Sequence, residues 1–204
     1  IDAIYEDING QQQKNIEELG FKITDVKLLL NAHAHSDHVN GSADMKKRTG
    51  ATVVAMAEDV SVLEDGGVTD FRNDGRKLWE PVKVDKVIHD GEKLTLGGVT
   101  LTARKTAGHT KGCTTYTMMV DDGGKQRQAI FICSLGLNGG VPLVNYPKYP
   151  NIAEDYMRSF DVLRSIPAEV FLVSHVAHYN FDDKVKKMGQ PGPNPFIDHK
   201  GYQD

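Results

Sequence analysis

Residues 33–38 of this chain read HAHSDH, and this hexapeptide constrains the fold and the chemistry more than any other segment. It follows an apolar run, Val26 to Leu30. A histidine or aspartate buried there without a partner would lose hydration at a large cost in free energy, which a bound metal cation removes. In an extended segment His33 and His35 point to the same side, whereas Asp37 and His38 follow on a turn and can face a second ion. The hexapeptide therefore predicts a site for two metal ions.

Two more histidines stand in comparable settings, His109 after the strand-like segment 99–105 and His175 after the apolar run 170–173. We predict a first site of three imidazoles and a second site with one carboxylate; the first set is His33, His35 and His109, and the second is Asp37, His38 and His175. Imidazole with a little oxygen and no thiolate suits zinc, so we expect two Zn²⁺ ions per chain. The other histidines, His89, His178 and His199, fit ordinary surface positions.

Composition agrees with one enzyme-sized domain. The chain has 204 residues, 39% hydrophobic and 25% charged, which is enough for one sizeable core over residues 1–204. With 24 basic and 28 acidic residues its net charge is −4, so nucleic acid is not an expected partner. No apolar stretch approaches the roughly 20 residues that span a bilayer, and we expect no membrane insertion. The two cysteines, Cys113 and Cys133, predict neither a disulfide framework nor a thiolate zinc site, and we expect two buried free thiols.

Short strands alternate with helices, which indicates an α/β layered fold. We expect helices at 9–19 and 42–49, buried strands at 26–30 and 51–55, and two hairpins that turn at Gly97-Gly98 and at 121–124. A further helix is predicted from Ile152, Tyr156, Phe160 and Leu163, whose spacing of four, four and three residues makes one apolar face. We assign that face to the core.

The longest polar stretch, 64–81, has the length of a lid or binding loop. Phe71 and Trp79 in this stretch are predicted to line a substrate cleft beside the metals. In the alternative, which is as well supported, Trp79 anchors the loop to the core.

Several segments resemble the metallo-β-lactamase superfamily, and more narrowly the third subclass of class B β-lactamases, in which the first zinc site is all histidine and no cysteine binds metal. The segments are HAHSDH (33–38), GHTKGCTTYTM (108–118), CSLGLN (133–138), YPNIAEDY (149–156), SHVAHY (174–179) and NPFIDHKGY (194–202). The resemblance covers nearly the whole chain. It implies an αβ/βα sandwich with a dinuclear zinc site at the edge where the two sheets meet.

The resemblance also implies an activity, the zinc-dependent hydrolysis of the β-lactam amide bond by a metal-bound hydroxide. This activity confers antibiotic resistance, and the family's usual place is the bacterial periplasm. Asp37 would orient the hydroxide, and Ser134 and Asn138 would donate hydrogen bonds to the carboxylate of a small β-lactam substrate. For these last two residues, capping of the turn between Cys133 and Gly140 is an equal alternative.

Two other functions compete with this one. Thioesterases, lactonases and tRNA-processing nucleases of the superfamily place a metal-bridging aspartate at the position of Ser134, so a lactone or thioester hydrolase is the second candidate. The third is an inactive zinc-binding fragment. It is suggested because the resemblance implies strands before Ile1 and a helix after Tyr202. On that ground we expect a sandwich that is incomplete at both termini, with an open strand edge through which copies could self-associate.

Overall fold

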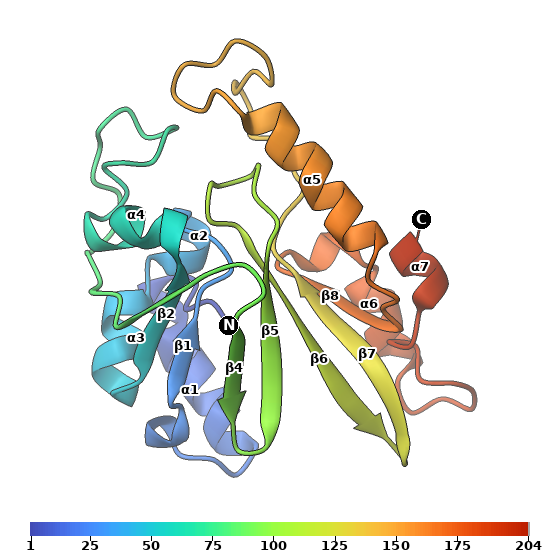
Figure 1. The fold of residues 1–204 in the computed structure, drawn as a ribbon. Coiled ribbons are helices and arrows are strands. Elements are labelled where there is room, and N and C mark those ends of the chain that lie inside the picture. The colour runs from blue at the N-terminus through green and yellow to red at the C-terminus, as the bar shows by residue number, and fades with distance from the viewer. Residues whose placement is uncertain (204) are drawn as a thin grey trace.

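The fold has four layers, in the order helix, sheet, sheet, helix (Figure 1). The structure is a computed structural model and describes residues 1–203. The N-terminal half supplies one sheet and its helices, and the C-terminal half supplies most of the other, so the two sheets pack face to face. The predicted αβ/βα sandwich is therefore confirmed. None of the helices in residues 1–203 has the length and apolar character needed to cross a membrane.

The first sheet is parallel, with strand order β1-β2-β3. Its strands are β1 (Leu28–Leu30), β2 (Thr52–Met56) and β3 (Lys86–Ile88). Along β2 the side chains alternate, because Val53 and Ala55 pack toward the outer helices whereas Val54 and Met56 pack toward the second sheet. Both faces are thus buried, as expected for a parallel sheet. The helices of this half are α1 (Asn9–Glu18), α2 (Ser36–Val39), α3 (Ser42–Thr49) and α4 (Val60–Glu64).

The second sheet has five strands in the order β4-β5-β6-β7-β8. They are β4 (Lys93–Leu96), β5 (Val99–Lys105), β6 (Thr114–Asp122), β7 (Lys125–Ile132) and β8 (Val170–Val173). Neighbouring strands are antiparallel except β7 and β8, which are parallel because α5 (Ile152–Arg164) lies on the crossover between them. The short helices α6 (Phe181–Lys187) and α7 (His199–Gln203) complete the outer layer.

Most predicted elements are confirmed, several to within one residue. The helix predicted at 42–49 is α3, and both hairpins form with the turns in the expected places. The assignment of Phe160 to the core is wrong, since its side chain is 38% exposed and stacks under the guanidinium of Arg164. Ser159 takes the buried position instead, because it lies nearer the centre of the face formed by Ile152, Tyr156 and Leu163.

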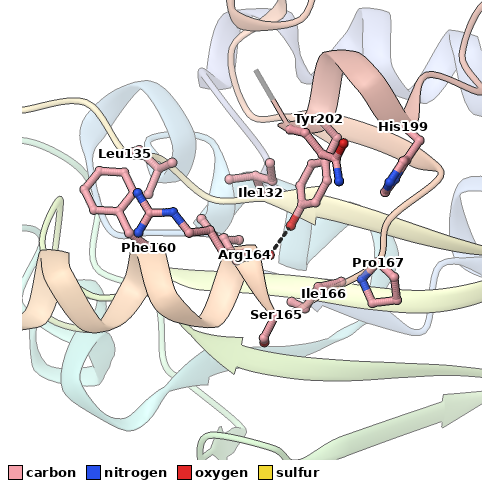
Figure 2. A pocket seen from close by; sticks show the side chains of 11 residues that line it. Ile132, Leu135, Phe160, Arg164, Ser165, Ile166, Pro167, His199 and Tyr202 are labelled. Carbon is pink, nitrogen blue, oxygen red and sulfur yellow. Dashed lines mark hydrogen bonds between the residues drawn. The ribbon is translucent and has the colours of Figure 1, made fainter.

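A pocket of about 680 Å³ opens between the C-terminal end of α5 and α7 (Figure 2). Ile132, Leu135 and Leu163 give it an apolar wall, and the Tyr202 hydroxyl closes one side by donating to the Leu163 carbonyl oxygen at 2.6 Å. None of the six predicted metal ligands lines this pocket. The candidate site lies instead where the histidines gather, after strands β1, β5 and β8.

Candidate metal centre

The hexapeptide lies where β1 ends and the chain turns into α2. His35 is the last extended residue before α2, so His33 and His35 precede the helix while Asp37 and His38 lie within its single turn. The amide of Asn31 holds the entry to this turn by donating to the His33 carbonyl oxygen at 3.1 Å. One short segment thus presents side chains in two directions.

The first group of candidate ligands brings together His33, His35 and His109. One ring nitrogen from each lies within 4.8 Å of the others. The closest approach, 3.0 Å, is between His35 Nδ1 and His109 Nε2. His33 is fully buried and His35 is 6% exposed, so these imidazoles face one another in a space with little water.

His33 carries the clearest indication that a cation belongs here. Its Nδ1 lies 3.6 Å from Cys133 Sγ and can donate to it, which leaves the lone pair on Nε2. That Nε2 is buried and has no hydrogen-bond partner among the residues described. Burial, followed by the charges of neighbouring histidines, holds the pKa of His33 well below its usual value, so the ring is neutral. A neutral imidazole with a free lone pair is the form that binds metal, and the residues therefore fit an ion.

The second group is Asp37, His38 and His175. Asp37 Oδ2 lies 3.4 Å from His38 Nε2 and 3.6 Å from His175 Nε2, and the two Nε2 atoms are 3.3 Å apart. His175 lies two residues after the end of β8, so this group joins α2 to the second sheet. Atoms of His33, Asp37 and His38 also lie within 4.8 Å of one another. The two groups are therefore adjacent.

Asp2 supports the second group, although nothing in the sequence pattern pointed to it. Its Oδ2 lies 2.9 Å from His38 Nδ1, and its Oδ1 accepts a hydrogen bond from the Ala32 amide at 2.7 Å. Burial alone would lower the pKa of His38, but hydrogen bonds to Asp2 and Asp37 outweigh it and raise the pKa to about 9. A cation that binds His38 Nε2 would displace the proton shared with Asp37, and the Asp2 carboxylate would then fix the tautomer and make Nε2 a better ligand.

A second buried aspartate, Asp59, links the two ligand-bearing loops. One of its oxygens accepts from the Ala34 amide at 3.0 Å and from the Thr110 hydroxyl at 2.9 Å, and the other accepts from the Gly112 amide at 2.8 Å. Burial raises its pKa to about 6, although these hydrogen bonds act in the opposite direction. Asp59 thus holds the loop of His33 and His35 against the loop of His109.

His109 is fixed from two further sides. Its Nδ1 lies 2.7 Å from the Gly136 carbonyl oxygen, to which it can donate. The preceding residue, Gly108, has a φ of 135°, and a Cβ atom there would lie 2.7 Å from the ring of Tyr156 on α5. Glycine is required at this position because the backbone must pass close to that ring. The helix layer therefore determines where His109 points.

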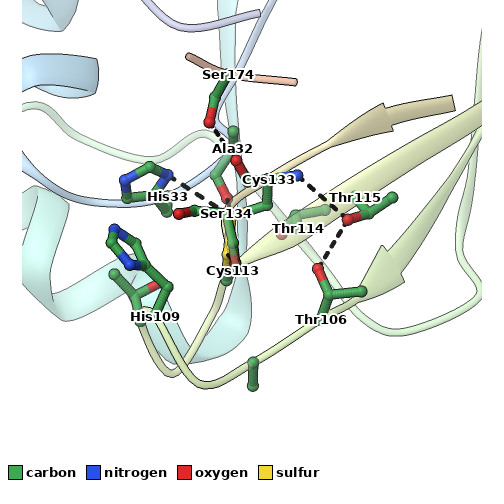
Figure 3. The surroundings of a disulfide bond; sticks show 12 residues. Ala32, His33, Thr106, His109, Cys113, Thr114, Thr115, Cys133, Ser134 and Ser174 are labelled. Atoms are coloured by element: carbon green, nitrogen blue, oxygen red, sulfur yellow. Dashed lines mark hydrogen bonds between the residues drawn. A yellow bond between two sulfur atoms is a disulfide. The ribbon is translucent and has the colours of Figure 1, made fainter. Parts of the chain in front are cut away.

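The prediction of two free thiols is wrong, since Cys113 and Cys133 form a disulfide (Figure 3). Their burial was expected correctly, because both side chains are inaccessible to solvent. The pairing follows from the β6–β7 hairpin, which brings the residue before β6 and the residue after β7 to the same end. Their Cα atoms are 5.9 Å apart, within the range that a disulfide spans. The bond lies directly behind His33.

The four residues proposed to contact substrate lie in different surroundings. Ser134 is 2% exposed, and its Oγ accepts from the Gly136 amide at 3.3 Å. Asn138 donates its side-chain amide to the His109 carbonyl oxygen at 2.8 Å. Phe71 packs against Tyr149 in a separate aromatic cluster. Trp79 is buried in the core between the first sheet and its helices, which agrees with the alternative that it anchors the loop.

Solved structures of metallo-β-lactamases are similar to this chain over nearly its whole length. The native FEZ-1 metallo-β-lactamase from Legionella gormanii superposes with a TM-score of 0.96 and 44% identity, over 99% of this chain and 78% of that one. BJP-1, a subclass B3 metallo-β-lactamase of Bradyrhizobium japonicum, gives a TM-score of 0.90 and 38% identity, over 98% of this chain and 76% of its own. The structural neighbours thus include the subclass that the sequence segments resemble.

Curated sequences add a different kind of relative. The hydroxyacylglutathione hydrolase of Methylococcus capsulatus is 27% identical over 69% of this chain and 44% of its own length. This chain spans less than half the length of the curated relatives that it matches. The profile of the family described as the metallo-beta-lactamase superfamily matches residues 1–175. With its layered fold, its clustered histidines and this match, the chain belongs to the metallo-β-lactamase superfamily of metal-dependent hydrolases.

Proposed function

We propose that this chain is a zinc-dependent β-lactamase that hydrolyses the amide bond of β-lactam antibiotics. The observation that carries the proposal is the donor set, which is rich in imidazole and includes only one carboxylate. Within residues 1–203, Asp37 is the one acidic residue in the clusters that could hold an ion. The similarity to FEZ-1 over 99% of the chain supports the same activity.

Each residue of the centre has a role in this proposal. His33, His35 and His109 would hold one zinc ion, and Asp37, His38 and His175 would hold the second. When bound, zinc lowers the pKa of water to about 7 and polarises a carbonyl group as a Lewis acid. Asp37 has a half-exposed carboxylate at the junction of the two groups. It can accept a hydrogen bond from the attacking water and hold its proton.

The periplasm is the compartment that we propose. Disulfides form and persist in oxidising compartments, and the Cys113–Cys133 bond is of the buried, structural kind. A small-molecule substrate fits this location, since β-lactams act outside the cytoplasmic membrane.

A thioester or lactone hydrolase is the second candidate, and the hydroxyacylglutathione hydrolases among the relatives favour it. Against it stands Ser134, which occupies the position where those enzymes are expected to carry a bridging aspartate. The Ser134 hydroxyl is buried and engaged with Gly136, and no carboxylate takes its place.

Hydrolysis of a chromogenic cephalosporin, measured with and without a chelator, tests the proposal. We expect turnover that the chelator abolishes and added zinc restores. Activity confined to lactones or thioesters would replace the proposal with the second candidate. Stoichiometric zinc without turnover of any of these substrates would indicate a zinc-binding protein that is not a hydrolase.

A further inference from the structure

Arg72 places a permanent positive charge at the edge of the histidine cluster. Its Nη1 lies 3.0 Å from His35 Nε2 and 3.2 Å from His35 Nδ1. A guanidinium stays protonated at any pH at which proteins fold. The residue belongs to the loop between α4 and β3, the polar stretch that the sequence singled out as a lid or binding loop.

The backbone on both sides of Arg72 is firmly held. Asp70, Phe71 and Asn73 are each less than 9% exposed, whereas Arg72 itself is exposed. The Arg72 amide donates to Asp70 Oδ1 at 2.8 Å, and the Tyr146 hydroxyl donates to the Phe71 carbonyl oxygen at 2.9 Å. The loop therefore fixes the point from which the side chain reaches the cluster, while leaving its guanidinium open to solvent.

This guanidinium lacks an anionic partner. Among residues 1–203 no carboxylate forms an ion pair with Arg72, although Arg48, Arg127 and Arg158 each have one. The imidazole of His35 offers it hydrogen-bond acceptors, and the nearby carboxylate of Asp70 accepts from the Arg72 backbone amide and interacts with the guanidinium through charge without forming an ion pair. A guanidinium without an ion-pair partner attracts an anion. Its planar group can donate two parallel N–H hydrogen bonds, which match the two oxygens of a carboxylate in particular.

The other candidate donors for a substrate carboxylate are already engaged. Ser134 is buried and its hydroxyl is held in the turn with Gly136. The amide of Asn138 is used to hold the backbone of His109. Arg72 is thus a donor that contacts the cluster and combines positive charge, exposure and the lack of an ion pair within residues 1–203, whereas the exposed Lys111 in the loop of His109 lies over the ring of Tyr149.

We propose that Arg72 binds the carboxylate of the substrate and makes this site selective for anionic lactams. The proposal rests on the hydrolase function proposed above, because it names the residue that selects substrates at the same site. It assigns recognition of the carboxylate mainly to the loop between α4 and β3, and leaves Ser134 and Asn138 as residues that shape the turn.

The test compares an acid with its ester. The probes are a bicyclic γ-lactam carboxylic acid, which the site cannot readily hydrolyse, and its methyl ester, which has the same rings without the charge. Binding of both is measured by titration calorimetry to the unchanged protein and to Arg72→Ala and Arg72→Lys, at equal zinc content. Lys77→Ala is the matched control, since Lys77 lies in the same loop but pairs with Glu80 at 3.2 Å.

We expect Arg72→Ala to weaken binding of the acid by about 10- to 100-fold, the range for a lost charge-assisted hydrogen bond, and to leave binding of the ester unchanged. The affinity of Arg72→Lys for the acid should lie between those of the unchanged protein and Arg72→Ala, because lysine keeps the positive charge but cannot donate two parallel hydrogen bonds to one carboxylate. Lys77→Ala should behave as the unchanged protein. Equal losses for acid and ester in Arg72→Ala, or no loss for the acid, would overturn the proposal.

Kinetics separate this proposal from the broader one. With a cephalosporin substrate, Arg72→Ala should raise KM by a similar factor and change kcat little, because the carboxylate is held alike before and during reaction. If the unchanged protein hydrolyses no cephalosporin, the β-lactamase proposal fails, yet the comparison of acid with ester still decides the role of Arg72. If it hydrolyses cephalosporins while Arg72→Ala shows no acid-specific loss, only the Arg72 proposal fails.

Discussion

At the scale of single residues, the centre depends on what stands behind each imidazole. His33 has disulfide sulfur behind it, His38 has the carboxylate of Asp2, and His109 has the Gly136 carbonyl oxygen. Each of these partners can accept a hydrogen bond from the ring nitrogen that faces away from the cluster. In His33 and His109 the remaining nitrogen keeps its lone pair for a cation, whereas in His38 the cation would displace a proton from Nε2. The partners thus help to set the ring orientations before any ion binds.

Asp37→Ala should remove one of the two zinc ions proposed for this site and most of the proposed β-lactamase activity. The carboxylate is the sole anionic member of the second group, and its loss leaves only His38 and His175 there. Metal analysis by mass spectrometry and the cephalosporin assay measure the two effects. Asp161→Ala on α5, exposed and distant in sequence, is the control. Two retained ions with full turnover in Asp37→Ala would show that this ligand assignment is wrong.

Asp2→Asn should weaken binding of the ion proposed for the second group and leave binding by the first group unchanged. Asparagine keeps an oxygen for the Ala32 amide and tolerates the positive φ of 59° at this position, but its amide group no longer accepts from His38 Nδ1. Losses of this kind lower metal affinity by about 10- to 100-fold. Competition with a chromophoric chelator gives the affinity of each ion. Equal affinities in both proteins would mean that Asp2 does not support the ligand.

The sequence alone identified the histidines but none of their supports. Four candidate ligands within six residues are a dense signal, and His109 and His175 stand out because each follows a strand-like run. Asp2 and Arg72 have no such signal, since each meets its histidine across more than thirty residues and only the folded chain brings them together. The side chains that tune the site are therefore found through the structure.

At the scale of elements, the centre is held by the loops that join strands to helices. The loop after β1 and the loop after β5 belong to different sheets, and Asp59 at the end of β2 accepts hydrogen bonds from both. Its three donors are two backbone amides and one hydroxyl. The geometry of the first group thus depends on one carboxylate that belongs to none of the candidate ligand clusters found within residues 1–203.

Asp59→Asn should lower the free energy of unfolding and loosen the first group. An amide nitrogen cannot accept, so at least one of the three donors is left buried without a partner, at a cost of about 1–3 kcal/mol. Urea unfolding of the zinc-free protein measures this cost, and Asp161→Asn serves as the surface control. If Asp59→Asn unfolds at the same urea concentration as the unchanged protein, the contacts of Asp59 add little to stability.

Element boundaries were predicted well where the local signal is strong. Helix α3 ends at Gly50, whose φ of 67° suits a glycine cap, and the hairpins turn at glycine pairs. The disulfide was missed because two cysteines in a chain of 204 residues carry no pairing pattern. The predicted hairpin already placed both cysteines at the same end of its two strands. The pairing register of those strands would have shown that the two residues lie close enough to bond.

At the scale of the whole molecule, the disulfide should contribute to the free energy of unfolding. It closes a loop of 20 residues, for which the chain-entropy estimate is about 3 kcal/mol. Replacing both Cys113 and Cys133 by Ala should lower Tm by roughly 6–12 °C in a protein of this size. Calorimetry of the zinc-free proteins under non-reducing conditions measures the shift. An unaltered Tm would show that the hairpin needs no covalent link.

The candidate ligands come from both sheets, since His33 to His38 follow β1 whereas His109 and His175 follow β5 and β8. Bound ions would therefore link the two halves of the sandwich, and the halves could not separate without releasing the ions. A ligand present at a thousand times its Kd adds about 4 kcal/mol to the stability of the state that binds it. The supply of free zinc would then determine the lifetime of the protein as well as its activity. In zinc-starved cells we expect molecules that open between their sheets and are degraded.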